Sequence, residues 1–135
     1  MDKFVKNFIL MSIVYLMVAS VLGVLMLGGG YGQLKFVHSH LMLLGWVSMM
    51  IYGVGYHILP KFAGRFLRSK AMAVLQFWMA NAGLIGMLAF YLVSFYDPAT
   101  PAWRALSTFF GAVEVLSIGL FFYNMLATIY SKEPE

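Results

Sequence analysis

The sequence contains no cysteine among its 135 residues. This absence excludes disulfide bonds, thiolate metal ligands, iron–sulfur clusters and haem attached through thioether bonds. Charge is also scarce, because Asp, Glu, Lys and Arg make up only 10% of the chain, against about 25% in soluble domains. Hydrophobic residues make up 62%, which leaves too little polar surface to cover a water-soluble globule and excludes disorder. We therefore predict one short domain embedded in a membrane.

Four apolar runs are long enough to cross a membrane, which takes about 20 residues in a helix. They cover residues 4–27, 36–59, 71–95 and 103–130. Glycine or proline stands at the junctions, and we predict that Pro60 ends the second run. No alternating pattern typical of a membrane β-barrel recurs. The prediction is an all-α, integral membrane four-helix bundle, whose first run is a retained helix and not a cleaved signal peptide.

Lysine and arginine are unevenly distributed between the two ends of these runs. Only Lys35 and Arg104 lie at one end. The other seven lie at the end shared by both termini and the second loop: Lys3, Lys6, Lys61, Arg65, Arg68, Lys70 and Lys132. Because cytoplasmic loops carry an excess of Lys and Arg, we predict that both termini are cytoplasmic. The net charge of +4 thus reflects topology and contacts with membrane lipid, and does not indicate nucleic acid as a partner.

All three histidines, His38, His40 and His57, lie on or beside the second run. Ionisable groups inside a membrane are costly and tend to be functional, although a histidine near the interface can also simply be hydrated. Residues two apart on a helix are rotated by about 200°, so His38 and His40 point to nearly opposite faces and cannot bind one metal. His57 lies about 25 Å from His40 along the helix, so the two cannot share a metal either.

Copies of the chain packed around an axis would bring His38 of one copy to face His40 of the next. Haem is the simplest large cofactor for two facing imidazoles in an apolar bundle. A divalent metal held by the same histidines between copies is the alternative. Two neighbouring residues are candidates for contact with the flat cofactor, Gly45 as a small residue and Trp46 as an aromatic one, although helix packing accounts for both as well.

Glu114 and Asn81 lie at similar depth near the middle of the fourth and third runs. One interpretation is a hydrogen bond between a protonated Glu114 and Asn81. The other is a proton-exchanging carboxyl group, in a relay or in a small proton-coupled transporter. Lys35 and Arg104 lie at the level of His38 and His40, either as anchors at the membrane boundary or as partners of an acidic group.

The stretch FVHSHLMLLGWVSMMIYGVGYHILPKFAG resembles the second transmembrane helix of the catalytic subunit of haem–copper oxidases and nitric oxide reductases. In that family a histidine near the outer end of this helix ligates the low-spin haem, and the helix continues through glycines to an aromatic-aliphatic-proline exit. The corresponding residues here are His38 or His40, Gly53, Gly55, Tyr56, Leu59 and Pro60. His38 and His40 are also similar to an H-x-H pair of that family whose two histidines ligate different haems. With four helices, the chain resembles one arc of the twelve-helix subunit.

The resemblance implies non-covalent haem b toward the outer face, with His38 and His40 as axial ligands. It also implies Lys35 and Arg104 as partners of the haem propionates, Arg104 in particular because Arg pairs with carboxylates in a bidentate manner. The family's copper site takes three further histidines, and the third run contains none, while His57 lies at the wrong end. We therefore expect no copper and no full reduction of oxygen, which leaves open whether the chain is an enzyme.

The expected assembly is a homo-oligomer, a trimer in preference to a dimer, because three copies would imitate the three arcs. The resemblance implies a cytoplasmic membrane of bacterial or archaeal type. The expected role is electron transfer with a respiratory donor, or sensing of redox state or a gas. Two alternatives remain open: a proton-coupled transporter that uses Glu114, and an accessory subunit of a respiratory oxidase without a cofactor.

Overall fold

The computed structural model describes residues 1–130, and these form helices and the loops between them. The first helix, α1, spans Lys3–Met26. The next three segments, α2 (Leu34–His40), η1 (Leu41–Ser48) and α3 (Met49–Phe62), follow one another without a break. The chain continues with α4 (Lys70–Tyr96) and α5 (Ala102–Ile129). Lys132, one of the seven cations counted above, lies outside the described residues.

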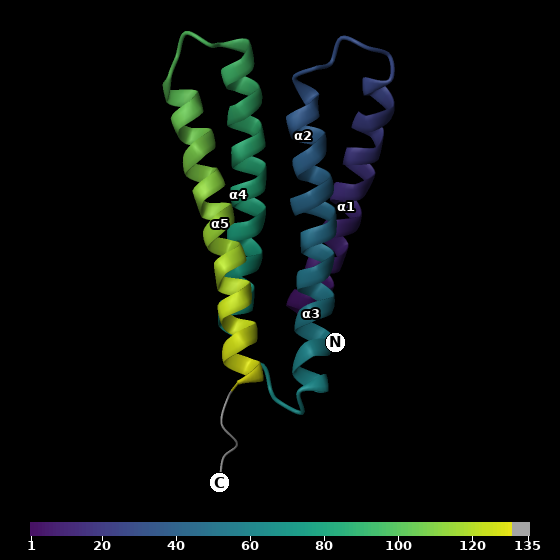
Figure 1. The fold of residues 1–135 in the computed structure, drawn as a ribbon, viewed down its shortest axis with the longest axis vertical. Coiled ribbons are helices and arrows are strands. Elements are labelled where there is room, and N and C mark those ends of the chain that lie inside the picture. The colour runs from purple at the N-terminus through teal and green to yellow at the C-terminus, as the bar shows by residue number, and fades with distance from the viewer. Residues whose placement is uncertain (131–135) are drawn as a thin grey trace.

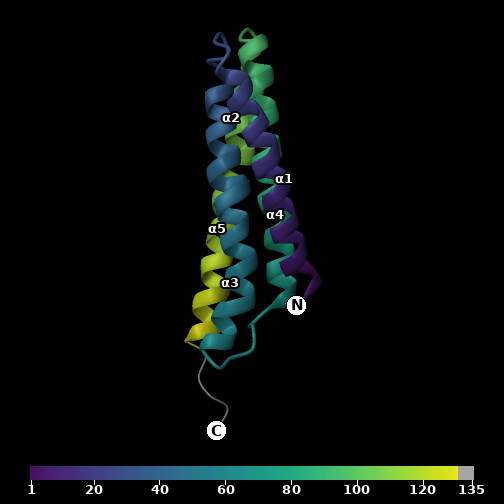
Figure 2. The same ribbon diagram turned by 90° about the vertical axis from the view of Figure 1, so that its right-hand side faces the viewer.

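Four helices are long and apolar enough to cross a membrane when α2, η1 and α3 are counted as one. They run side by side along the longest axis of the molecule (Figures 1 and 2). The N-terminus, the loop between α3 and α4 and the end of α5 lie together at one end, which we call the basic end. The other two loops lie at the opposite end. The all-α, four-helix membrane class is thus confirmed, and the side that faces the cytoplasm stays a prediction.

The bundle consists of two helical hairpins. One is α1 packed on the α2–η1–α3 helix, and the other is α4 packed on α5, which is the most extensive contact in the molecule (Figure 1). Aromatic side chains join the hairpins in the half nearer the basic end. Phe8 of α1 meets Phe77 of α4 edge to face at 5.1 Å, and the rings of Tyr52 on α3 and Phe121 on α5 lie 4.7 Å apart. Such pairs each contribute about 0.5–1.5 kcal/mol beyond their buried area.

Pro60 does not end the second membrane helix, contrary to our prediction from the sequence. It lies inside α3, which continues to Phe62. Proline removes one backbone donor within a helix, but membrane helices tolerate this where neighbouring groups satisfy the freed carbonyls. The helix ends at Gly64 instead, where the Arg65 N–H donates to the Pro60 carbonyl at 2.8 Å and the Gly64 N–H donates to the Lys61 carbonyl at 3.1 Å. This is the Schellman pattern of helix ends.

Replacing Gly64 with alanine tests this helix end. Gly64 has a φ of +63°, a conformation that costs residues with a side chain about 1–2 kcal/mol. We expect Gly64→Ala to lower the free energy of unfolding by about 1 kcal/mol, measured by unfolding in mixed micelles with increasing sodium dodecyl sulfate. Gly32→Ala in the loop before α2 is the matched control, since Gly32 has no positive φ and open space around it. Equal stability of the two variants would contradict the assignment of this helix end.

Two polar side chains fix the ends of α4. Ser69 precedes its first turn in an extended conformation, and its Oγ accepts a hydrogen bond from the Met72 N–H at 3.1 Å. This is an N-cap of the usual kind. Asp97 follows its last residue, and its Oδ2 accepts a hydrogen bond from the Trp103 indole N–H at 3.0 Å. Donors from Trp103 and Thr100 hold the pKa of the Asp97 carboxyl below its usual value, so this carboxylate stays charged beside the membrane.

Candidate functional site

His38 faces α1 within its own chain. Its Nδ1 lies 3.0 Å from the carbonyl oxygen of Ala19. A β-carbon built at Gly23 would lie 3.0 Å from Cε1 of the imidazole, so the ring rests directly on the glycine. The absence of a side chain at Gly23 therefore makes the space in which the half-buried His38 ring lies.

His40 faces the other side of α2, toward α4. Its Nδ1 lies 2.8 Å from the carbonyl oxygen of Phe36 one turn earlier. Its ring lies over the ring of Phe36 with centroids 3.9 Å apart, and Phe36 stacks in turn on Tyr91 of α4 at 4.2 Å. His38 and His40 therefore lie on opposite sides of one helix, as the two-residue spacing predicts, and the chain does not bring them together.

The hydrogen bonds of the two histidines fix which nitrogen carries the proton. A carbonyl oxygen only accepts, so Nδ1 of both His38 and His40 must be the protonated donor. In a neutral imidazole with this arrangement, Nε2 carries the lone pair, and neither Nε2 has a hydrogen-bond partner within residues 1–130. Histidines that ligate metals commonly show this arrangement, with one nitrogen on the metal and the other N–H held by a carbonyl. The hydrogen bonds of both imidazoles are thus compatible with metal ligation through Nε2.

A π-helix, η1, begins directly after His40. Such segments are rare and occur frequently at functional sites. The hydroxyl of Ser48 donates to the carbonyl of Leu43 five residues earlier at 2.9 Å. Gly45 lies within η1 against Tyr15 of α1, since a β-carbon there would lie 2.8 Å from the Tyr15 side chain. Gly45 thus allows η1 to approach α1, and the half-buried Trp46 follows it.

The third histidine belongs to a different part of the molecule. His57 lies on α3 near the basic end, where the Lys61 ammonium group donates to its Nε2 at 3.1 Å. Nowhere in residues 1–130 do three His, Cys, Asp or Glu side chains form a group that could hold a metal ion. The structure therefore separates His57 from His38 and His40, and a complete metal site within one chain is not present among these residues.

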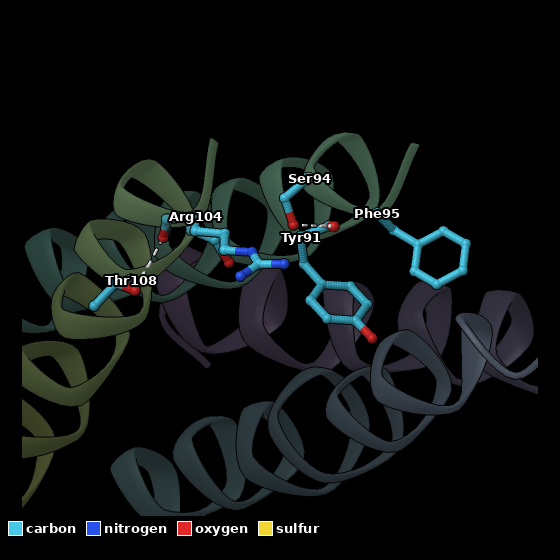
Figure 3. Close-up of a pocket in the computed structure, with 6 residues that line it drawn as sticks. Tyr91, Ser94, Phe95, Arg104 and Thr108 are labelled. Carbon is cyan, nitrogen blue, oxygen red and sulfur yellow. Dashed lines mark hydrogen bonds between the residues drawn. The ribbon is translucent and has the colours of Figure 1, made fainter. Parts of the chain in front are cut away.

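Arg104 lines a cavity of about 450 Å³ near the opposite end, between α4 and α5 (Figure 3). The other lining residues are Tyr91, Ser94, Phe95, Ser107 and Thr108. Tyr91 also stacks on Phe36, and the His40 ring contacts the same Phe36 ring. Ring contacts therefore connect the cavity to His40. Lys35 and Arg104 are both exposed, and Lys35 does not line this cavity. Of these two cations, Arg104 is therefore the one that borders a cavity.

Glu114 is buried in the middle of α5, with 2% of its surface exposed. The predicted hydrogen bond with Asn81 is wrong: both carboxyl oxygens of Glu114 lack a hydrogen-bond partner. Asn81 instead accepts a hydrogen bond from the Tyr15 hydroxyl at 2.7 Å and donates to the carbonyl of Phe77 at 2.7 Å. The role of Tyr15 was not predicted, because a tyrosine within an apolar run gives no sign of its partner.

No protein-family model, curated protein or solved structure matches this chain. Its candidate function therefore rests on its own residues. Two features carry most chemical information: the imidazoles of His38 and His40 with their free Nε2 atoms, and the buried carboxyl of Glu114. They lie on different helices and involve different contacts, so each is interpreted separately below.

Proposed function

We propose that the protein binds haem b between copies of itself, with His38 of one copy and His40 of the next as axial ligands. The observation that carries this proposal is that both imidazoles are hydrogen-bonded in the same way. Each donates its Nδ1–H to a backbone carbonyl, at 3.0 Å for His38 and 2.8 Å for His40, which leaves both Nε2 lone pairs free. The proposed role is electron transfer, or sensing of redox state or a gas, in a respiratory membrane.

The donor set fits haem and requires more than one chain. Neutral imidazole nitrogens are the common axial ligands of b-type haem, and helix bundles hold such cofactors between facing helices. Because His38 and His40 lie on opposite sides of α2, one copy supplies a single ligand to each haem. A closed ring of copies, a trimer in preference to a dimer, gives every His38 a His40 as its partner.

Other residues of the opposite end have supporting roles in this proposal. Arg104, which lines the cavity between α4 and α5, is the proposed partner of a propionate, and Lys35 is a second exposed cation at this end. Trp46 contributes an apolar contact near the ring, and Gly45 keeps η1 against α1. When bound, the haem iron supplies one-electron chemistry. The residues of the chain hold the cofactor, orient the imidazoles and keep water from the site.

The resemblance of the sequence to haem–copper oxidases supports only part of this proposal. Four membrane helices and a pair of histidines at the end opposite the basic end are compatible with one arc of such an enzyme. The chain has three histidines in all, and His57 bonds to Lys61 at the basic end. We therefore propose a haem protein without a copper centre, and not an enzyme that reduces oxygen to water.

Haem titration of the purified protein tests the proposal. The protein is isolated in detergent, haemin is added stepwise, and spectra are recorded before and after reduction with dithionite. Two histidine ligands make the iron low-spin, so we expect saturable binding and a sharp α band in the reduced state. A protein that takes up no haem would overturn the proposal. Elemental analysis of the same preparation detects a divalent metal, which would favour the alternative site between copies.

Substitution of Gly23 tests whether the position of His38 matters for haem binding. A β-carbon at Gly23 lies 3.0 Å from the imidazole, so the branched side chain of Gly23→Val must push the ring away. We expect haem affinity to fall about 10-fold to 100-fold, as for other changes to the groups that orient a metal ligand. Gly119→Val is the matched control, since nothing lies within 4 Å of a β-carbon at Gly119. Equal affinity of the two variants would contradict a role of His38.

A further inference from the structure

The bundle contains buried polar side-chain atoms without hydrogen-bond partners, from its middle toward the basic end. Five such atoms are Gln76 Nε2 and Oε1, Glu114 Oε1 and Oε2, and Ser117 Oγ. Tyr56 Oη and Asn124 Oδ1 are equally inaccessible and belong to side chains that lie near each other. Gln76, Ser117 and Asn124 are fully buried. In folded proteins, most buried polar groups are bonded to protein or to ordered water, and leaving one unbonded costs about 1–3 kcal/mol. These atoms therefore need hydrogen-bond partners, which ordered water can supply.

The polar side chains form one column along α5. Glu114, Ser117, Asn124 and Thr128 recur at spacings of three, seven and four residues, which places them on one face over about 21 Å of helix. All four are buried. Thr128 lies nearest to the basic end and Glu114 lies deepest in the bundle.

The facing helices contribute to the same column. On α4, Gly83 lies against the backbone of Glu114, and the Asn124 amide donates to the carbonyl of Ser69 at 2.8 Å. Because α4 and α5 are antiparallel, Gln76 lies halfway between these two contacts, beside the stretch of α5 that carries Ser117. Tyr56 of α3 lies beside this face of α5, since its ring meets that of Phe121 at 5.1 Å and its hydroxyl lies near Asn124.

The column reaches the surface at the basic end. The backbone N–H of Arg68 donates to the Thr128 hydroxyl at 3.0 Å, and Ser69 accepts from Asn124. Arg68 is exposed and Ser69 is partly exposed, so these contacts lie at the boundary with water. The polar face of α5 therefore reaches the boundary with water at Thr128 and Asn124.

The column is closed on the other side of Glu114. One turn before Glu114 on α5, toward the opposite end, Phe110 fills the space beside Gly86 and stacks on Phe90 at 5.6 Å. Met87 and Leu88 of α4 are buried at the same level, and the Met87 sulfur lies 3.3 Å from a β-carbon built at Gly111. Apolar packing thus separates Glu114 from the opposite end of the bundle.

We propose that this column holds a chain of water molecules through which Glu114 exchanges its proton with the basic end only. In that exchange, a hydronium ion at the Ser69 boundary delivers a proton along the waters, and the Glu114 carboxylate becomes a neutral carboxyl group. Water fits better than a metal cation, because the unpartnered atoms include the Gln76 amide nitrogen, a donor that no cation binds. The proposal does not depend on haem.

The groups that face Glu114 are consistent with a proton as the exchanged charge. The hydroxyls of Tyr15 on α1 and Tyr52 on α3 are the titratable groups within electrostatic reach, and α4 presents Gly83. None of these supplies a positive charge to balance a carboxylate. A carboxyl group in this position is therefore stabilised by taking up a proton.

Infrared spectroscopy of the haem-free full chain in lipid vesicles tests both the exchange and its side. The C=O stretching band of the protonated carboxyl is assigned to Glu114 by its loss in Glu114→Gln. In vesicles with the basic end outside, we expect a pH jump in the external medium to change this band at once. In vesicles of the reverse orientation, the band should not follow external pH. A band that follows the opposite side, or that never responds to pH, would overturn the proposal.

A pair of glutamine variants tests the route. Gln76→Leu replaces the unpartnered amide with an apolar side chain of similar size, which removes a polar partner of the waters and is tolerated by an apolar bundle. We expect the response of the Glu114 band to slow by about tenfold or more, since the relay is interrupted. Gln33→Leu, in the loop before α2, makes the same change outside the column and should leave the rate as in the wild type. Equal rates in the two variants would contradict this route.

Discussion

Replacing His40 with alanine is expected to abolish stoichiometric haem binding. The variant removes one of two axial ligands, and even changes to the groups that orient a metal ligand lower affinity about 10-fold to 100-fold. We therefore expect a loss of at least about 100-fold in haem affinity and no low-spin spectrum. His38→Ala should have the same effect, because the proposed site needs one ligand of each kind. Optical titration with haemin measures both.

His57→Ala is the matched control for this prediction. His57 bonds to Lys61 near the basic end and belongs to neither side of the proposed site. We expect this variant to bind haem with wild-type affinity and spectrum. Loss of haem in His57→Ala but not in His40→Ala would show that the ligands have been assigned to the wrong end of the helix.

Replacing Gly83 with valine is expected to lower the free energy of unfolding more than the glycine substitutions described above. A β-carbon at this position would lie 2.7 Å from the backbone nitrogen of Glu114 and 2.9 Å from its Cα. Backbone atoms cannot rotate away as a side chain can, so α4 and α5 must separate. Overpacking of this kind costs about 1–3 kcal/mol and occasionally more, and we expect about 3 kcal/mol for Gly83→Val. Unfolding in mixed micelles measures the change.

Gly119→Val serves again as the control, since Gly119 lies on α5 with open space around it. Its valine variant should unfold within about 0.5 kcal/mol of the wild type, because only helix propensity changes. Equal destabilisation of both variants would mean that valine disturbs α4 and α5 through their helical conformation. In that case the close approach at Gly83 would not be the source of their association.

Much of the architecture follows from hydrophobicity alone. Long apolar runs in a chain with 10% charged residues leave no alternative to membrane helices. The placement of His38 and His40 on opposite sides of their helix follows from a two-residue spacing, since helical geometry fixes that rotation. By contrast, Pro60 misled the prediction of a helix end. The loop supplies stabilising hydrogen bonds at Gly64, and these depend on a backbone conformation that the sequence only suggests.

The partners of individual polar side chains could not be predicted in the same way. Asn81 and Glu114 lie at similar depth, but depth does not determine how a helix is rotated about its axis. In the structure, Tyr15 takes the place that was assigned to Glu114. Gly45 in the π-helix after His40 packs against Tyr15, and such a tertiary contact cannot be read from the sequence. Gln76 could have been noticed, since a glutamine inside an apolar run needs a hydrogen-bond partner across helices.

A subunit-mixing experiment tests whether each haem is shared by two copies of the chain. His38→Ala and His40→Ala chains are each expected to lack haem on their own. In oligomers assembled from equal amounts of both, an interface is intact only where a chain that keeps His38 meets one that keeps His40. Random assembly should therefore restore about one quarter of the wild-type haem content, with its low-spin spectrum. If the wild type binds haem but the mixture contains none, the site is not shared between copies and the account is wrong.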